Sequence, residues 1–472
     1  MNVNKANLQQ LYCCAFNYVN ACMLVLGVCF LFMAERTQAQ VELKGINTAP
    51  NLSGSFNRDS LARDSRFNQP LDLLNDFYPS IEVRLENTSN VQRRTDVRNS
   101  DNRLIVNPAL AYRTSIGRHG FYAAYTGRFT RHADFTQENV NSNNVSLQLG
   151  LDLSKRWDLD LFGDFGNARE ERGVSGTRDF FLSVEDGVFV GQGPDRVSYE
   201  TVGFDLAYGR KLGRLVAVAG YERRTSDFRS EQGGLLEGGD RDRLEESIHF
   251  DINYQLSSKT SVFARIENTK SDFTRINDTL DSDVTTWLVG LRVSPTSRLS
   301  GVVGYGQTER DLEDPSRNGF DGNTYYANIT YAITPFSRVE FGAARSVEEP
   351  SSSDASFFVS ELFSLSWRHE LTEKLSLDTF VKTLDDDFEN GRRDEFVDWG
   401  VSLDYSLRSW LSVGAYYQDI DRDSNVANVE FEDRIFGIRL KSDLRSLISA
   451  RRSKKHVEPA SFRRSTRTNV SQ

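Results

Sequence analysis

Residues 144–167 read NVSLQLGLDLSKRWDLDLFGDFGN and contain two alternating segments joined by a short turn. Val145, Leu147 and Leu149 alternate with polar or small residues, which is the two-residue period of a strand with one apolar face. A helix would instead place its apolar residues three and four positions apart. The stretch therefore predicts a β-hairpin whose turn carries the basic residue Arg156.

The same hairpin recurs along the chain, with a short turn at one end and a longer polar loop at the other. A basic residue marks each short turn, at positions 118, 156, 214, 259, 298, 338, 374 and 408. Strands are predicted near 79–87, 102–113, 120–131, 144–153, 157–167, 198–209, 214–226, 245–256, 260–270, 284–294, 298–309, 323–333, 338–347, 359–370, 374–384, 397–407, 410–421 and 433–442. Regular hairpins of this kind are typical of a sheet that crosses a membrane repeatedly and closes on itself.

The predicted fold is all-β, an antiparallel up-and-down transmembrane β-barrel of about 18 strands, with 16 as the alternative count. An even number returns the chain to its starting side. The first connection, residues 88–101, is long, and long loops face outward in such barrels, so both termini are expected to be periplasmic. Only alternate residues face lipid, so a mean hydropathy of -0.49 is compatible with this fold.

The N-terminal region predicts export. Residues 21–34 form an apolar run of 14 residues, shorter than the roughly 20 that a spanning helix needs, so residues 1–39 are interpreted as a signal peptide cleaved after Ala39. An uncleaved anchor and a lipoprotein at Cys29 are the alternatives. All four cysteines precede residue 40, so the mature chain would have no disulfide or thiol chemistry.

The remaining chain divides into three expected parts. Residues 40–77 are polar and are interpreted as a flexible periplasmic leader, and residues 78–442 as the barrel. Residues 443–472 form a basic tail that is expected to be disordered, with contact to anionic headgroups or to a periplasmic partner as the alternative.

The long loops are acidic, notably over residues 310–322 and 385–395. They are interpreted as ordinary solvated loops, and binding of divalent cations near lipopolysaccharide is the alternative. The longest, residues 168–197, contains Asp186-Gly187 between β-rich runs, which predicts a hairpin outside the barrel or inside its lumen. Aromatic residues near strand ends, such as Trp157, Tyr208 and Tyr416, are expected at the headgroup level.

The sequence shows no catalytic motif. It contains five histidines and neither H-E-x-x-H, G-x-S-x-G nor a P-loop, so no catalytic residue, cofactor site or metal site is predicted. His249 and Asp251 share the inward face of one strand, which could orient an imidazole in a barrel hydrolase, but a lumen-lining role is the favoured interpretation. The protein is therefore interpreted as a non-enzyme.

Charge on the predicted inward faces is the feature most relevant to function. Such charges either select solutes or fill and rigidify the interior. The candidate lumen-lining residues are Arg84, Arg103, Arg113, Arg128, Asp205, Asp251, Arg265, Arg292, Arg368, Asp404 and Arg439.

Three stretches carry a family resemblance: YPSIEVRLENTSNV at 78–91, SDNRLIVNPAL at 100–110 and GYERRTSDF at 220–228. They resemble the Putative beta-barrel porin 2 family, over roughly residues 78–440. The resemblance implies an outer-membrane role in carrying exopolysaccharide or capsule polymer outward. One feature departs from the pattern, because about 30 residues follow Leu440 where outer-membrane barrels usually end on an aromatic residue.

The leading hypothesis is an outer-membrane channel or secretion component of a Gram-negative bacterium, which exports exopolysaccharide or passes hydrophilic solutes. A plugged barrel that acts as a scaffold for surface polymer, and a soluble β-solenoid, are the alternatives. Expected partners are outer-membrane lipid and lipopolysaccharide, the barrel assembly machinery and polysaccharide export components, with no nucleic acid.

Overall fold

The computed structural model describes residues 76–170, 172–174, 196–209, 213–229, 241–274, 278–350, 355–427 and 429–443. The expected signal peptide, most of the leader, the turn at 186–187 and the basic tail after Asp443 lie outside these ranges. The described residues form 18 strands: β1 (Asp76–Thr88), β2 (Asp101–Ile116), β3 (His119–His132), β4 (Val140–Asp152), β5 (Trp157–Arg169), β6 (Arg196–Gly209), β7 (Leu215–Arg229), β8 (Arg243–Ser257), β9 (Thr260–Phe273), β10 (Ser282–Val293), β11 (Leu299–Leu312), β12 (Phe320–Thr334), β13 (Ser337–Glu348), β14 (Phe358–Glu370), β15 (Leu375–Phe388), β16 (Arg393–Arg408), β17 (Leu411–Ser424) and β18 (Phe431–Asp443).

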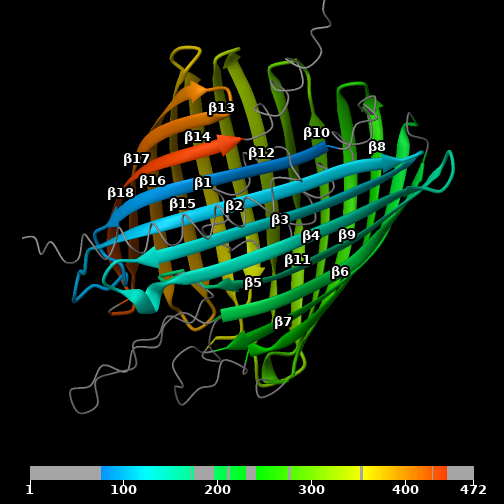
Figure 1. The fold of residues 1–472 in the computed structure, drawn as a ribbon. Helices are drawn as coiled ribbons and strands as arrows, with labels where there is room; N and C mark the ends of the chain where they lie inside the picture. The colour runs from blue at the N-terminus through cyan, green and yellow to red at the C-terminus, as the bar shows by residue number, and fades with distance from the viewer. Residues whose placement is uncertain are drawn as a thin grey trace, which may run out of the picture.

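Each strand pairs antiparallel with its neighbours in the sequence, and β1 also pairs with β18, so the sheet is closed. The closing ladder runs from Ser80 opposite Asp443 to Thr88 opposite Ile435. Figure 1 shows the result, with β1 in blue between β18 and β2. The predicted antiparallel barrel of 18 strands is confirmed, and the alternative count of 16 is wrong.

The strands extend further than predicted, mainly at the end that carries the long loops. The expected acidic loop at 385–395 is largely strand, because β15 continues to Phe388 and β16 begins at Arg393. The expected loop at 310–322 likewise shrinks to residues 313–319. Both faces are polar here, so alternation gives no signal, but the backbone ladder continues regardless of side-chain polarity.

Five of the short turns share one hydrogen-bonding pattern. A Ser or Thr hydroxyl accepts a backbone N–H two residues on, as in Ser154 with Arg156, Thr296 with Arg298 and Thr372 with Lys374, each at 3.2 Å. Such turns fit the tight connections between antiparallel strands. Two of the basic residues assigned to turns lie instead at strand ends, Arg338 in β13 and Arg408 in β16.

The two faces of the wall differ in chemistry. Directly opposite residues in a ladder share a face, and the registers carry one consistent assignment around the whole sheet. Outward positions hold exposed apolar side chains such as Leu147, Phe250 and Leu403, and inward positions hold buried charges such as Glu86 and Arg265. None of the helical turns in the described part of the chain has the length and apolar character needed to cross a membrane.

Candidate functional site

The barrel interior is the candidate site, because it gathers the charged side chains that the sequence singled out. The structure places all eleven candidate residues on the inward face. Seven of them belong to two ion-pair networks, one at the closing seam and one around His249. Their contact with a solute stays a prediction.

The first network, here called the seam network, is centred on Glu86 of β1, which is 5% exposed. Its Oε2 accepts a hydrogen bond from Arg103 Nε of β2 at 2.6 Å, and Arg84 Nη1 lies 3.9 Å from Oε1. The hydroxyl of Tyr416, from β17, donates to the same carboxylate. Charge-assisted hydrogen bonds therefore join β17, β1 and β2 on the inside of the wall.

A second part of the seam network surrounds Arg439 of β18. Its guanidinium donates to Asp404 of β16, with Nε at 2.8 Å from Oδ1, and to Ser402 Oγ at 3.0 Å. Lys441 Nζ of β18 lies 3.5 Å from Glu82 Oε2 of β1. The first and last strands are thus held by side chains as well as by backbone pairing.

The second network surrounds His249 of β8. Its Nε2 lies 3.2 Å from Asp205 Oδ1 of β6 and 3.8 Å from Asp251 Oδ2. Arg265 of β9 contacts Asp251 at 3.4 Å and Glu267 at 2.9 Å. The hydrolase alternative required an imidazole oriented toward a nucleophile, whereas Nε2 of this ring faces two carboxylates in a wall of paired charges.

Three of these contacts reach across an intervening strand, and each crosses a glycine. Tyr416 lies over Gly437 to reach Glu86, Asp404 over Gly414 to reach Arg439, and His249 over Gly220 to reach Asp205. In each case the glycine is directly opposite the side chain that crosses it. A Cβ there would overlap the crossing side chain, so the missing side chain makes the long contact possible.

Sequence reasoning missed these glycine-bridged pairs. Tyr416 was expected at the membrane interface and instead points inward, half-buried. An inward glycine on the neighbouring strand could have indicated these pairs. It can be matched to the side chain that crosses it only when the strand register is known. That expectation for Tyr416 is wrong because adjacent Tyr416 and Tyr417 occupy opposite faces.

The remaining four candidates lie outside these two networks. Arg113 lies opposite Asp76 in the ladder between β2 and β1, and Arg128 lies opposite Ser142 of β4. Arg292 is half-buried near the short-turn end of β10. Arg368 Nη1 lies 3.5 Å from Asp378 with its side chain 54% exposed, so this pair contributes little to stability.

The inward face of β4–β6 is acidic. It carries Asp152, Asp158, Asp160, Asp164 and Asp205, and the described inward positions of these three strands include no Lys or Arg. Asp152 is directly opposite Asp158, and Asp160 is directly opposite Asp205. Carboxylates concentrated on one sector favour cations along that side of a pore.

A short segment after β5 lies across the long-loop end of the barrel. Arg172 forms a bidentate contact with Glu138, at 2.7 and 3.1 Å, and both side chains are buried. Its carbonyl accepts a hydrogen bond from Arg93 Nη1 at 2.6 Å. Gly173 packs against the inward Phe431 of β18, five strands away from β5 around the wall. This mouth segment, Arg172–Val174, therefore covers part of the opening.

Other contacts tie the long connections together. Arg241 donates to both oxygens of Glu170 at 2.9 and 3.0 Å, and Asn318 donates to Glu389 at 2.6 Å. Backbone and hydroxyl hydrogen bonds from Ser316 lower the pKa of Asp314. The described long-loop end is thus a cross-linked rim, and in the described residues no cluster of three or more His, Cys, Asp or Glu side chains suits a metal ion.

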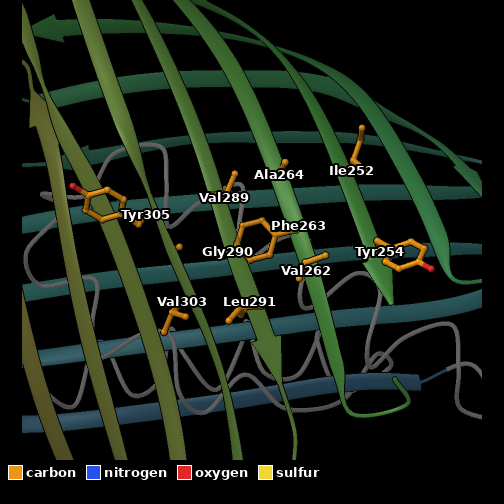
Figure 2. A pocket seen from close by; sticks show the side chains of 11 residues that line it. Ile252, Tyr254, Val262, Phe263, Ala264, Val289, Gly290, Leu291, Val303 and Tyr305 are labelled. Atoms are coloured by element: carbon orange, nitrogen blue, oxygen red, sulfur yellow. The ribbon is translucent and has the colours of Figure 1, made fainter. Parts of the chain in front are cut away.

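The outer surface carries one apolar hollow of about 610 Å³ over β8–β11. Figure 2 shows it around Ala264, with Val289 and Leu291 on the neighbouring strand and Tyr254 and Tyr305 on the flanking strands. These side chains lie on the outward face, so the hollow does not belong to the lumen.

Comparison with known proteins gives one family match. The family model Putative beta-barrel porin 2 matches residues 77–443. Similar solved structures include OccK2 (OpdF) of Pseudomonas aeruginosa in complex with glucuronate, at 13% identity and a TM-score of 0.43 over 78% of this chain and 98% of that one. Another is the alcaligin outer membrane receptor FauA of Bordetella pertussis, at 10% identity and a TM-score of 0.37 over 80% and 76% of the two chains. The search of curated proteins found no match.

Proposed function

Because the chain belongs to the Putative beta-barrel porin 2 family, we propose that it is a non-enzymatic channel in the outer membrane of a Gram-negative bacterium, with both termini in the periplasm. The observation that carries this proposal is the closed wall with exposed apolar side chains outside and paired charges inside. Lipid requires the first property and a hydrophilic solute requires the second. Export of exopolysaccharide through this interior is the finer form of the proposal, supported by the family resemblance.

Strand length supports the proposed orientation. The strands have 12 to 16 residues, whereas crossing a bilayer needs about 9 to 11. The residues by which the strands exceed their predicted ranges lie mainly at the long-loop end, as expected if the barrel projects from the outer surface. Lipid, lipopolysaccharide, the barrel assembly machinery and polymer export components are the partners that this role requires.

Purified protein in planar bilayers is expected to give discrete, cation-selective conductance, because the acidic sector of β4–β6 faces the lumen. Replacing both Asp158 and Asp160 by asparagine should move the reversal potential in a salt gradient toward the value for anions. The matched control is Asp314→Asn, which lies in a long loop. An absence of conductance in membranes that contain the folded barrel would contradict an open pore. An unchanged reversal potential in the double variant would contradict the role of the acidic sector.

The mouth segment favours a second candidate, a barrel closed by its own chain that serves as a scaffold for surface polymer. Arg172 and Glu138 are both buried and paired, which holds the segment across the opening. Breaking this pair distinguishes a plugged barrel from an open one.

The double variant Glu138→Gln with Arg172→Gln is expected to raise single-channel conductance several-fold if the mouth segment closes the barrel, because its bidentate contact is lost. Bilayer recordings of the variant and of Arg338→Gln, whose ion pair is exposed, provide the measurement and its control. Equal conductance in all three proteins would reject the plug and support an opening that the segment leaves free.

A further inference from the structure

The two ends of the barrel differ in charge. Counted over the sequence, the connections at the short-turn end contain nine Lys or Arg and one acid, Glu373. The long connections contain 21 Asp or Glu and nine Lys or Arg. The basic rim is defined here by the described, exposed residues Arg118, Lys155, Arg156, Arg214, Lys259, Arg298, Lys374 and Arg408.

Hydrogen bonds hold the backbone of this rim in a repeating arrangement. The carbonyls of Arg156, Lys259, Arg298 and Lys374 each accept a hydrogen bond from the strand end of the next hairpin, at 2.7 or 2.8 Å. In the same four turns the hydroxyls of Ser154, Ser257, Thr296 and Thr372 accept backbone N–H groups. The basic side chains therefore extend from turns whose backbone is held by hydrogen bonds at the same end of the strands.

The side chains of the basic rim retain their charge for an external partner. Arg118 donates to the carbonyl of Leu153 at 3.0 Å, and Lys259 donates to the carbonyl of Pro295 at 2.7 Å. Both acceptors are neutral. Over the residues that the structure describes, no salt bridge joins a member of the basic rim to a carboxylate, whereas the inward charges are extensively paired. Arg338, at the start of β13, is left out of the rim because it lies 3.6 Å from Glu340.

Exposed apolar side chains lie directly beside the cations. Ile116 is 74% exposed next to Arg118. Beside Arg156, the ring of Trp157 lies against that of Tyr208, with centroids 4.8 Å apart and planes tilted by 53°. Leu256, Phe336, Leu371 and Leu407 continue this apolar ring at the other turns. An apolar band that ends in aromatic rings and long cationic side chains is the composition of a protein surface at the headgroup level.

We infer that the basic rim binds the phosphate groups of an anionic phospholipid leaflet around the full circumference of the barrel. Members of the basic rim occur at seven of the eight short turns, with the β12–β13 turn as the exception. This spread around the circumference fits a lipid ring better than a protein docked on one sector. Arg and Lys beside an anionic lipid surface gain electrostatic attraction that salt screens. The inference rests on the proposed membrane-spanning role and adds that the short turns face the phospholipid leaflet.

The test uses the full chain refolded into phosphatidylcholine vesicles with and without phosphatidylglycerol. Phosphatidylglycerol is expected to raise the midpoint of thermal unfolding by several degrees at low salt, and the rise should shrink at high salt. A variant with Lys155, Arg156, Lys259, Arg298 and Lys374 replaced by glutamine should lose this rise. The control replaces Arg94, Arg98 and Arg317, all in long loops, by glutamine and should keep it.

If the variant with five substitutions does not fold, the double variant Arg156→Gln with Arg298→Gln is used instead. It should lose part of the increase in unfolding midpoint that phosphatidylglycerol causes. The inference is overturned if a rim variant keeps the full rise or if the long-loop control loses it. Conductance of the same samples separates the two proposals. A conducting barrel without dependence on phosphatidylglycerol refutes the lipid site alone, whereas failure to insert into either vesicle refutes the membrane-spanning role.

Discussion

Glu86→Ala is expected to cause a large loss of barrel stability, about 3–5 kcal/mol, because it removes the acceptor shared by the seam network. Arg103 and Tyr416 would lose a buried partner, and Arg84 would lose a nearby opposite charge. Burying a guanidinium without its carboxylate costs far more than losing an exposed pair. The site of the loss is the ladder between β1 and β18, which closes the sheet.

The measurement is the temperature at which the compact band on a semi-native gel converts to the unfolded band. Glu340→Ala is the matched control, since Glu340 is also an inward acid beside an arginine, but the pair has 46% and 59% exposed side chains. Its expected effect is less than about 1 kcal/mol. Equal conversion temperatures for the two variants would show that the seam network does not stabilise the closure.

Among glycine-to-alanine substitutions in the strands, Gly306→Ala is expected to destabilise the barrel most. The expected loss in the free energy of unfolding is on the order of 4 kcal/mol or more. A Cβ at this inward position of β11 would overlap the carbonyl oxygen of Trp287 and approach its carbonyl carbon at 2.8 Å. These atoms belong to the backbone of β10, which is held in the ladder with β11. The strands would have to separate locally, because no side-chain rotation relieves the overlap.

Gly342→Ala provides the comparison, because it adds the same methyl group at another inward strand position. Its Cβ would approach only the side chain of Ser364, whose hydroxyl is free to rotate away. Replacing a glycine also lowers the conformational entropy of the unfolded chain, which favours the folded state and offsets that adjustment. The free energy of unfolding should therefore stay within about 1 kcal/mol of that of the parent protein. Denaturant unfolding of both variants in the same vesicles tests the contrast, and a similar loss in each would reject the backbone explanation.

The strand number and the face of the charged candidate residues were predictable because alternation is a local property, whereas the face of Tyr416 was not. Arg84, Asp251 and Arg439 could be assigned to the inward face from their neighbours alone. The ends of the strands were harder to predict from the sequence. Asp386 and Asp394, for example, lie in paired strands although both faces are polar there. Hydrogen bonding of the backbone continues where the hydrophobic pattern has ended.

The partners within the site were not predictable, because they depend on register and on residues far apart in the chain. The contact between Tyr416 and Glu86 joins residues 330 positions apart and requires Gly437 between them. The mouth segment depends on Arg172 meeting Glu138 from a different loop. A single sequence without pairing information does not specify which of many arginines and carboxylates meet.

The closing seam has a consequence for the time course of assembly. Thr88 donates a hydrogen bond to Asp433, 345 positions later, so the contacts that join β1 to β18 form only after the whole barrel sequence is present. Until then both edge strands expose unpaired backbone groups, which invite pairing with other chains. Such distant contacts also slow folding. Closure is therefore the expected late, rate-limiting step, and a chain truncated before β18 would remain an open sheet that is prone to aggregate.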